Sequence, residues 1–297
     1  MLLEDFLALM VNGVTLGAVY AMAGIGLNIA YKPTNVFNLA QGEFVMLGAM
    51  LGWLFLTDMS MAWIVGTIGV VLAVGALGVL EERVAVAPHL KVQSHHHGWL
   101  ISTLAFSIII INIADQVFRA DPRFVPSLPG TSLDTMFVGP VAFNTHQVAV
   151  LVIVVASVFA IEYVYRRTRI GKAISAVSED RDGARLNGIN PLHLTMISFA
   201  AGAAYCAFAG IIAAPLMLAS TSLGLALLVK GFMAIALGGV GSNWGTLLAG
   251  IIIGCVESLS SITLSTGYRQ LLLLGILLVV LLIRPNGLFG KAAGRSV

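Results

Sequence analysis

The chain has 297 residues, of which 58% are hydrophobic and 10% are charged, and its formal net charge is +2. Soluble domains carry about 25% charged residues, so this composition excludes a soluble globular protein and indicates a polytopic membrane protein. The 32 glycines favour close packing of helices in lipid. Both cysteines, Cys206 and Cys255, lie in apolar stretches without a CxxC partner, which argues against a disulfide or a metal pair.

Apolar segments separated by short polar stretches fill the chain. They cover residues 6–31, 36–57, 59–80, 98–114, 148–165, 195–217, 223–237, 246–264 and 271–283. We therefore predict an all-α fold with about eight to ten transmembrane helices, forming a single transmembrane domain over residues 1–297. The glycine-rich segment 238–245 interrupts two of these segments, and it leaves the number of crossings open within that range. Between the membrane helices, residues 119–145 are expected to form an ordered extramembrane loop with a short hairpin near 136–143.

The distribution of positive charge predicts the orientation in the membrane. If all nine segments cross the bilayer and the N-terminus is outside, twelve basic residues face the cytoplasm and three face outward: Arg119, Arg123 and Arg269. Short cytoplasmic loops are enriched in Lys and Arg, so we predict an external N-terminus and a cytoplasmic C-terminus. A re-entrant 223–237 segment would move the basic tail outside, which the same rule disfavours.

The polar segment 166–194 carries six of the sixteen basic residues. Its apolar residues recur at roughly helical spacing, which predicts one amphipathic helix over residues 171–186. We expect Gly188 to take a positive φ after this helix, Asn190 to cap the next membrane helix and Pro191 to occupy its first turn. The segment is either a solvated basic loop that sets orientation or a docking helix for a cytoplasmic partner.

A few polar and ionisable side chains interrupt the apolar segments. Charges inside a bilayer need a partner, a polar cavity or a position near the interface. Snorkelling would explain Asp115 and Lys230, and hydrogen bonds between helices would explain Glu43 and Glu257. The alternative is that polar groups line a transport path, for which the candidates are Asn38, Gln41, Glu43, Asn243 and Glu257.

Sequence signatures of enzymes are absent from this chain. No GxxxxGK[ST], HExxH or GxSxG pattern occurs, so we expect neither an ATP site nor catalysis in this chain. The run His95-His96-His97 does not predict a metal site, because consecutive residues do not share one face of a helix. A membrane enzyme that uses this histidine run remains the weakest alternative.

Two patterns connect the chain to a known family. Glu179, Ala184, Gly188, Ile189 and Pro191 are similar to the E–A–G–I–P arrangement in the cytoplasmic loop of ABC-transporter membrane subunits. The stretches 12–44, 171–190, 230–258 and 282–290 together resemble the permease subunits of Liv-type branched-chain amino acid ABC importers. Segment 81–97 departs from the family, which usually has more arginine and proline there.

The resemblance implies an inner-membrane permease that forms half of a translocation path. The implied partners are a second permease, two cytoplasmic ATPases that bind the ATP, an external substrate-binding protein and the lipid bilayer, but no nucleic acid. The segment 166–194 would then be a coupling loop, in which arginines pair with acidic groups of the ATPase while Ala184 and Ile189 fill its groove. The expected coupling residues are Glu179, Arg181, Ala184, Arg185, Gly188 and Ile189.

Two other functions stay open at this stage. The resembling family includes permeases for urea and short-chain amides, and the substrate cannot be read from this chain alone. An ion-coupled secondary transporter would use Glu43 and Glu257 to bind the coupling ion.

Overall fold

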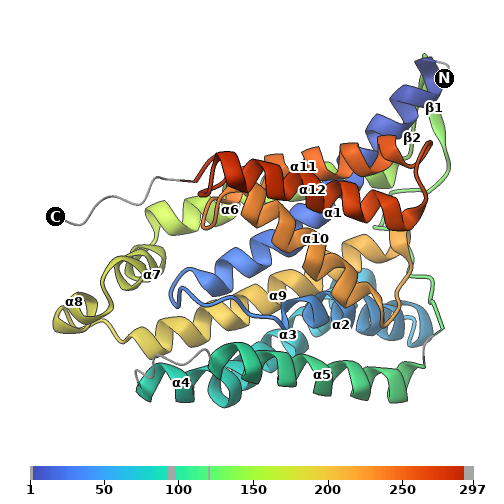
Figure 1. Ribbon diagram of the computed structural model, residues 1–297. Coiled ribbons are helices and arrows are strands. Elements are labelled where there is room, and N and C mark those ends of the chain that lie inside the picture. The colour runs from blue at the N-terminus through green and yellow to red at the C-terminus, as the bar shows by residue number, and fades with distance from the viewer. Residues whose placement is uncertain (1–2, 93–97, 120, 291–297) are drawn as a thin grey trace. The chain divides into compact units, whose positions relative to one another are not determined.

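The protein is described by a computed structural model that covers residues 3–92, 98–119 and 121–290 (Figure 1). Within these residues the chain is mostly helical, which confirms the predicted all-α polytopic fold. The helices are α1 (Leu3–Tyr31), α2 (Gln41–Trp53), α3 (Trp63–Glu81), α4 (Ala87–Val92), α5 (Gly98–Phe118), α6 (Thr145–Arg167), α7 (Arg169–Glu179), α8 (Arg181–Leu186), α9 (Pro191–Met217), α10 (Leu223–Gly238), α11 (Asn243–Ser260) and α12 (Thr266–Ile283). Two π-helical turns, η1 (Leu54–Asp58) and η2 (Glu82–Val86), follow α2 and α3. The histidine run 95–97 lies outside the described residues.

Among the described residues, seven helices are long and apolar enough to cross a membrane. They are α1, α3 with its extension, α5, α6, α9, α11 and α12. Helix α10 is apolar but shorter, and α2 has only 13 residues before η1. The chain is therefore a multi-pass membrane protein, and the prediction of nine crossings with an external N-terminus stays a prediction.

The chain divides into two compact units, which are described separately. The first comprises residues 1–25, 127–158 and 229–297, and the second comprises residues 26–126 and 159–228. Helices α1, α6 and α10 each begin in one unit and end in the other. The prediction of a single domain over 1–297 is neither confirmed nor contradicted by this division.

In the second unit, α2 and α3 pack directly on α9. A side chain at Gly48 would collide with the backbone of Ala207, and one at Gly210 would collide with the carbonyl oxygen of Val45. A side chain at Gly78 would similarly meet the backbone of Phe199. These glycines let helix backbones touch, which is how helices gain packing contacts where lipid supplies no hydrophobic driving force.

In the first unit, α1 and α11 approach through glycines in the same manner. A side chain at Gly17 would collide with the backbone of Gly250, and one at Gly254 would collide with the backbone of Gly13. The predicted hairpin is confirmed: β1 (Met136–Val138) pairs antiparallel with β2 (Val141–Phe143). Gly139, with φ 61°, supplies the left-handed residue of its two-residue turn.

Two boundaries differ from the sequence predictions. The segment expected to be helical from residue 36 becomes helical only at Gln41, because Asn35 adopts a left-handed φ of 55° and the Asn38 side chain accepts from the Ala40 N–H at 2.9 Å. The polar stretch between the apolar segments 59–80 and 98–114 is instead helical as far as Val92, through η2 and α4. In both places the sequence prediction relied on composition, whereas local hydrogen bonds determine the backbone conformation.

Candidate coupling surface and buried polar clusters

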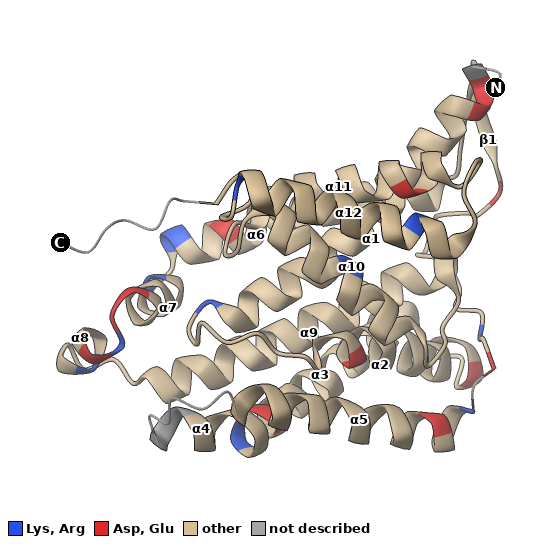
Figure 2. Ribbon diagram, viewed as in Figure 1, with Lys and Arg blue, Asp and Glu red and all other residues tan. Residues whose placement is uncertain are grey.

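The basic segment forms two short helices, so the prediction of one helix over 171–186 is wrong. Helix α7 ends at Glu179 and α8 begins at Arg181, with Asp180 extended between them at φ −147° and ψ 108°. The Asp180 carboxylate accepts from the N–H groups of Asp182 at 3.1 Å and Gly183 at 3.0 Å. Asp180 therefore caps α8 instead of continuing α7, as aspartate favours at helix N-termini. Figure 2 shows charged residues gathered along α7 and α8 and sparse over the long helices.

Replacing Asp180 with alanine is expected to loosen α8. Loss of an N-cap costs about 1 kcal/mol, which is about a fivefold change in a local opening equilibrium. Hydrogen exchange of the amides of residues 182–186 should therefore become about fivefold faster, while the long helices keep their protection. Asp180→Ser is the matched control, because serine retains a capping oxygen. Equal exchange in the alanine and serine variants would contradict the capping role.

The junction after α8 follows the sequence prediction. Gly188 has φ 78°, and the Asn190 side chain accepts from the N–H groups of Leu192 at 3.1 Å and His193 at 3.4 Å. Pro191 occupies the first turn of α9. These local signals fix where α8 stops and α9 starts, so α7 and α8 are held between two long helices.

The apolar side of α7 and α8 is buried against the same chain. Its core consists of Tyr165, Ile174, Val177, Ala184 and Leu194, with Ile189 partly buried against it. A side chain at Gly171 would collide with the carbonyl oxygen of Val164, so α7 lies directly on the end of α6. Ala184 is only 5% exposed within this core, and its expected role in filling a groove of the ATPase stays a prediction. It fixes α8 on the chain itself.

The opposite side of α7 and α8 presents Leu186 and charged residues. Leu186 is 90% exposed, the largest exposed fraction among the large hydrophobic side chains of the described residues. Arg185 and Glu179 are exposed, and Arg185 lies 3.8 Å from the Asp182 carboxylate. The exposed position of Leu186 was not predicted from the sequence. The available signal was a leucine at the end of the predicted helix that does not belong to its apolar face.

Arg181 differs from its neighbour Arg185. Its side chain is only partly exposed, and its Nη2 is buried without a hydrogen-bond partner among the described residues. Burial lowers the pKa of the Arg181 guanidinium from its ordinary value, and the positive charge of Arg185 acts in the same direction. Of the two arginines expected to contact a partner, Arg185 is therefore the more available one.

A cation–π contact joins the end of α6 to the residue that follows α1. The Lys32 ammonium lies 3.7 Å from the centroid of the Tyr165 ring, a cation–π contact. Tyr165 also belongs to the apolar core under α7 and α8. Lys32 follows α1 directly, so the Tyr165 ring contacts the chain just before the non-helical segment that carries Asn38.

Three of the expected path residues lie in the second unit, and two of them, Asn38 and Gln41, are hydrogen-bonded to each other. Asn38 donates from Nδ2 to Gln41 Oε1 at 3.0 Å and to Glu81 Oε2 at 2.7 Å. Ser107 donates to Glu43 Oε1 at 3.1 Å. Asn38, Gln41 and Glu43 are each at most 2% exposed. Hydrogen bonds thus account for Asn38, Gln41 and one carboxylate oxygen of Glu43, whereas Glu43 Oε2 is buried without a hydrogen-bond partner among the described residues. The role of these groups in a transport path stays a prediction.

Glu81 is the member of this cluster that sequence reasoning missed. It is fully buried and lies at the end of α3, directly after the apolar segment 59–80. Its Oε1 atom has no hydrogen-bond partner among the described residues. A pair of glutamates at the end of an apolar run was the available signal, but only the fold brings Asn38 to it.

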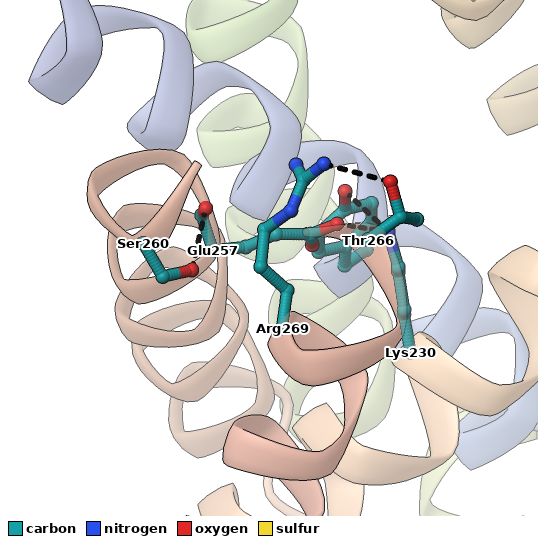
Figure 3. Close-up of polar contacts among 6 residues, drawn as sticks. Lys230, Glu257, Ser260, Thr266 and Arg269 are labelled. Carbon is teal, nitrogen blue, oxygen red and sulfur yellow. Dashed lines mark hydrogen bonds and ion pairs between the residues drawn. The ribbon is translucent and has the colours of Figure 1, made fainter. Parts of the chain in front are cut away.

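The other two expected path residues, Asn243 and Glu257, belong to the first unit. Asn243 is buried at the start of α11. The helix break before α11 contains Gly239 with φ 101° and Gly241 with φ 83°. Glu257 forms an ion pair with Lys230, in which Lys230 Nζ lies 2.6 Å from Glu257 Oε1 (Figure 3). Lys230 therefore pairs within the protein, and the expectation that it snorkels is wrong.

No group of three or more His, Cys, Asp or Glu side chains that could hold a metal occurs in the part of the chain that the structure describes. The fold and these clusters together define a polytopic membrane protein with long apolar helices, buried polar groups between them, and a pair of short polar helices between two of the long helices.

The comparison with known proteins gives the family. Residues 9–282 match the family described as branched-chain amino acid transport system / permease component, and the chain belongs to it. LivH of Salmonella typhimurium, a high-affinity branched-chain amino acid transport system permease protein, is 31% identical and the alignment covers 96% of each chain. BraD of Pseudomonas aeruginosa, with the same description, is 28% identical over 96% of each chain. LivM of Escherichia coli is 25% identical over 92% of this chain and 68% of LivM. The family is one of transport permeases, not of enzymes.

Proposed function

We propose that this chain is the membrane permease subunit of an ABC importer and forms half of its path for branched-chain amino acids. The observation that carries the proposal is the 31% identity to LivH along 96% of both chains. One side of the helix pair α7–α8 packs on its own chain and the other side is exposed, which agrees with a docking role for segment 166–194. A urea or amide permease and an ion-coupled transporter are not favoured by these relatives.

The proposed complex contains a second permease, two cytoplasmic ATPases that bind the ATP, and an external substrate-binding protein. The match to both LivH and LivM supports a pair of different but related permeases. The excess of basic residues on one side supports an inner-membrane location with the N-terminus outside and α7–α8 in the cytoplasm. No cofactor is assigned to this chain.

In the proposed mechanism, α7 and α8 move as one body when the ATPases close. Leu186 enters an apolar groove of the ATPase, and Arg185 and Glu179 of this chain form a charged rim around that contact. The buried Ala184, together with Gly188 and Ile189, holds the helix pair on its own chain. The movement reaches the polar cluster of Asn38, Gln41 and Glu43 through the Tyr165 ring and Lys32.

Replacing Tyr165 with leucine is expected to uncouple ATP hydrolysis from uptake. Leucine fills the apolar core but loses the ring on which Lys32 rests, whereas phenylalanine retains it. The number of amino acids transported per ATP hydrolysed should fall severalfold in Tyr165→Leu and stay near the wild-type value in Tyr165→Phe. ATPase co-purification should be normal in both. A proportional loss of hydrolysis and uptake in the leucine variant would argue for simple damage to the core.

Uptake of labelled leucine tests the proposed function directly. Cells that lack this chain should lose high-affinity leucine uptake and regain it when the chain is supplied. The uptake should fail when ATP is depleted and persist when the proton or sodium gradient is collapsed. Uptake that follows the ion gradient instead, or uptake of urea in place of leucine, would contradict the proposal.

A further inference from the structure

The segment between α1 and α2, residues 33–40, runs back along α9 without being helical, and we call it the return segment. A side chain at Gly26, near the end of α1, would collide with Cys206 Sγ. Gln41 Nε2, at the start of α2, donates to the same sulfur atom at 3.2 Å. The last turns of α1 and the start of α2 therefore lie at the same height beside α9, and the return segment leads from the end of α1 back to that height (Figure 1).

The position of Cys206 in α9 places the start of α2 at membrane depth. Cys206 is 15 residues after the first residue of α9 and 11 before its last, which at a rise of about 1.5 Å per residue is about 22 Å and 16 Å from the two ends. Non-helical backbone at such depth is found where protein buries it or where it lines a polar cavity, and interrupted helices of this kind line the paths of transporters. The return segment and the start of α2 are therefore well suited to line the path of the proposed importer.

The Asn38 side chain connects the return segment to α3. Its Oδ1 accepts from the Ala40 N–H at 2.9 Å, and its Nδ2 donates to Gln41 Oε1 at 3.0 Å, so two of its hydrogen bonds stay within the same stretch of chain. A third bond crosses to another helix, because Asn38 Nδ2 also donates to Glu81 Oε2 at 2.7 Å. A hydrogen bond this short to a buried carboxyl oxygen fixes where the return segment lies relative to the end of α3.

Glu81 is held rigidly and is buried at a cost that packing does not explain. Gly78, three residues earlier, packs against the backbone of Phe199, and in η2, which follows Glu81, the Ala85 carbonyl accepts from Ser102 Oγ at 2.6 Å. Glu81 is 0% exposed, and its Oε1 has no hydrogen-bond partner among the described residues. An apolar side chain would avoid the free-energy cost of that unpaired oxygen, whereas the bond to Asn38 requires an acceptor at this position.

We propose that Glu81 is a positioning residue of the translocation path, which acts through Asn38 to hold the return segment and the start of α2 in place. The inference rests on the proposed function and gives a role to a residue that the mechanism above does not use. Without the Glu81 carboxyl group, Asn38 keeps its bonds to Ala40 and Gln41 but loses its connection to α3. The path then no longer follows the movement of the helices around it, so ATP is hydrolysed while fewer amino acids cross.

The test measures leucine transported per ATP hydrolysed by the complete complex in proteoliposomes, with its permease and ATPase partners and the external binding protein. Glu81→Leu, which has a similar volume but no acceptor, should lower this ratio at least fivefold while recovery of the ATPases stays within twofold. Glu81→Gln retains an oxygen for Asn38 and should keep at least half of the wild-type ratio. Thr67→Val is the matched control, because Thr67 is also buried on α3 and its Oγ1 has no hydrogen-bond partner among the described residues. An unchanged ratio in Glu81→Leu, or an equal loss in the leucine and glutamine variants, would overturn the inference.

Hydrogen exchange shows whether Glu81 holds the return segment. In the same complexes, the amides of residues 36–40 should exchange at least fivefold faster in Glu81→Leu than in the wild type or in Glu81→Gln, while α9 keeps its protection. Equal exchange in all three would overturn the inference. If the wild-type complex shows no ATP-driven leucine uptake, the proposed function is wrong, and the exchange rates still decide whether Glu81 positions the segment.

Variants of Asn38 show whether Glu81 acts through this residue. Asn38→Ser keeps an oxygen for the Ala40 N–H but loses the donor to Glu81, so it should reproduce both the lower transport ratio and the faster exchange, including the case in which Glu81→Leu does not accumulate. The double variant Asn38→Ser/Glu81→Leu should lose no more than Asn38→Ser alone, because both changes break the same bond. Losses that multiply in the double variant would show that the two residues act independently, and would overturn the inference.

Discussion

Replacing Leu186 with aspartate is expected to abolish ATP-driven uptake while the chain still folds. Leu186 is 90% exposed, so the change removes no internal packing. If its side chain enters an apolar groove of the ATPase, burial of this leucine contributes about 1.5–3 kcal/mol, and a buried unpaired carboxylate would add a further penalty. The affinity of the ATPases for the permease should then fall at least about tenfold. Pull-down of the ATPases with the tagged chain, together with leucine uptake, measures both effects.

Leu186→Met is the matched control for this prediction. Methionine has a similar volume and remains apolar, so it should retain ATPase binding and uptake close to the wild-type values. Normal ATPase recovery with Leu186→Asp would show that α8 does not dock through this residue. Equal loss in both variants would point to a requirement for shape at this position instead of an apolar contact.

Replacing Gly48 with valine is expected to prevent assembly of the second unit. The new side chain would collide with the carbonyl oxygen, Cα and carbonyl carbon of Ala207, which are backbone atoms and cannot rotate away. Overpacking in a core usually costs about 1–3 kcal/mol, and a collision between two helix backbones lies at or above the upper end. The variant should fail to accumulate in the membrane or should unfold at a clearly lower temperature in detergent.

Gly275→Val controls for the change in volume and shape. A side chain at Gly275 would have no neighbouring atom within 4 Å, although the residue also lies in a membrane helix. This variant should accumulate normally. If Gly48→Val is equally well tolerated, then α2 and α9 do not pack backbone to backbone as described.

Local rules were sufficient wherever one short stretch determines the backbone. Gly188, Asn190 and Pro191 end one helix and begin the next as predicted, and the hairpin expected near 136–143 forms, with its turn at Gly139. Asp180 shows the limit of this reasoning. An aspartate can occupy an interior helical position or a capping position, and the sequence context does not distinguish them; in the folded chain Asp180 caps α8.

Tertiary contacts account for the parts of the candidate sites that the sequence did not predict. Polarity identified Asn38, Gln41 and Glu43, but Glu81 joins them from about 40 residues away in the chain, and no periodicity relates the two. Ala184 and Leu186 are both apolar residues of one short helix, yet one is buried and the other exposed. Which of them faces outward depends on the angle at Asp180, which only the folded chain shows.

The central claim is that this chain works as one half of an ATP-driven permease. The most direct measurement is affinity purification of the tagged chain from its native membrane under mild conditions, with mass spectrometry of the proteins that accompany it. We expect two P-loop ATPases and a second, related permease in comparable amounts, and we expect Leu186→Asp to release the ATPases while the second permease stays. Recovery of the chain alone, under conditions that keep other ABC complexes intact, would contradict the claim.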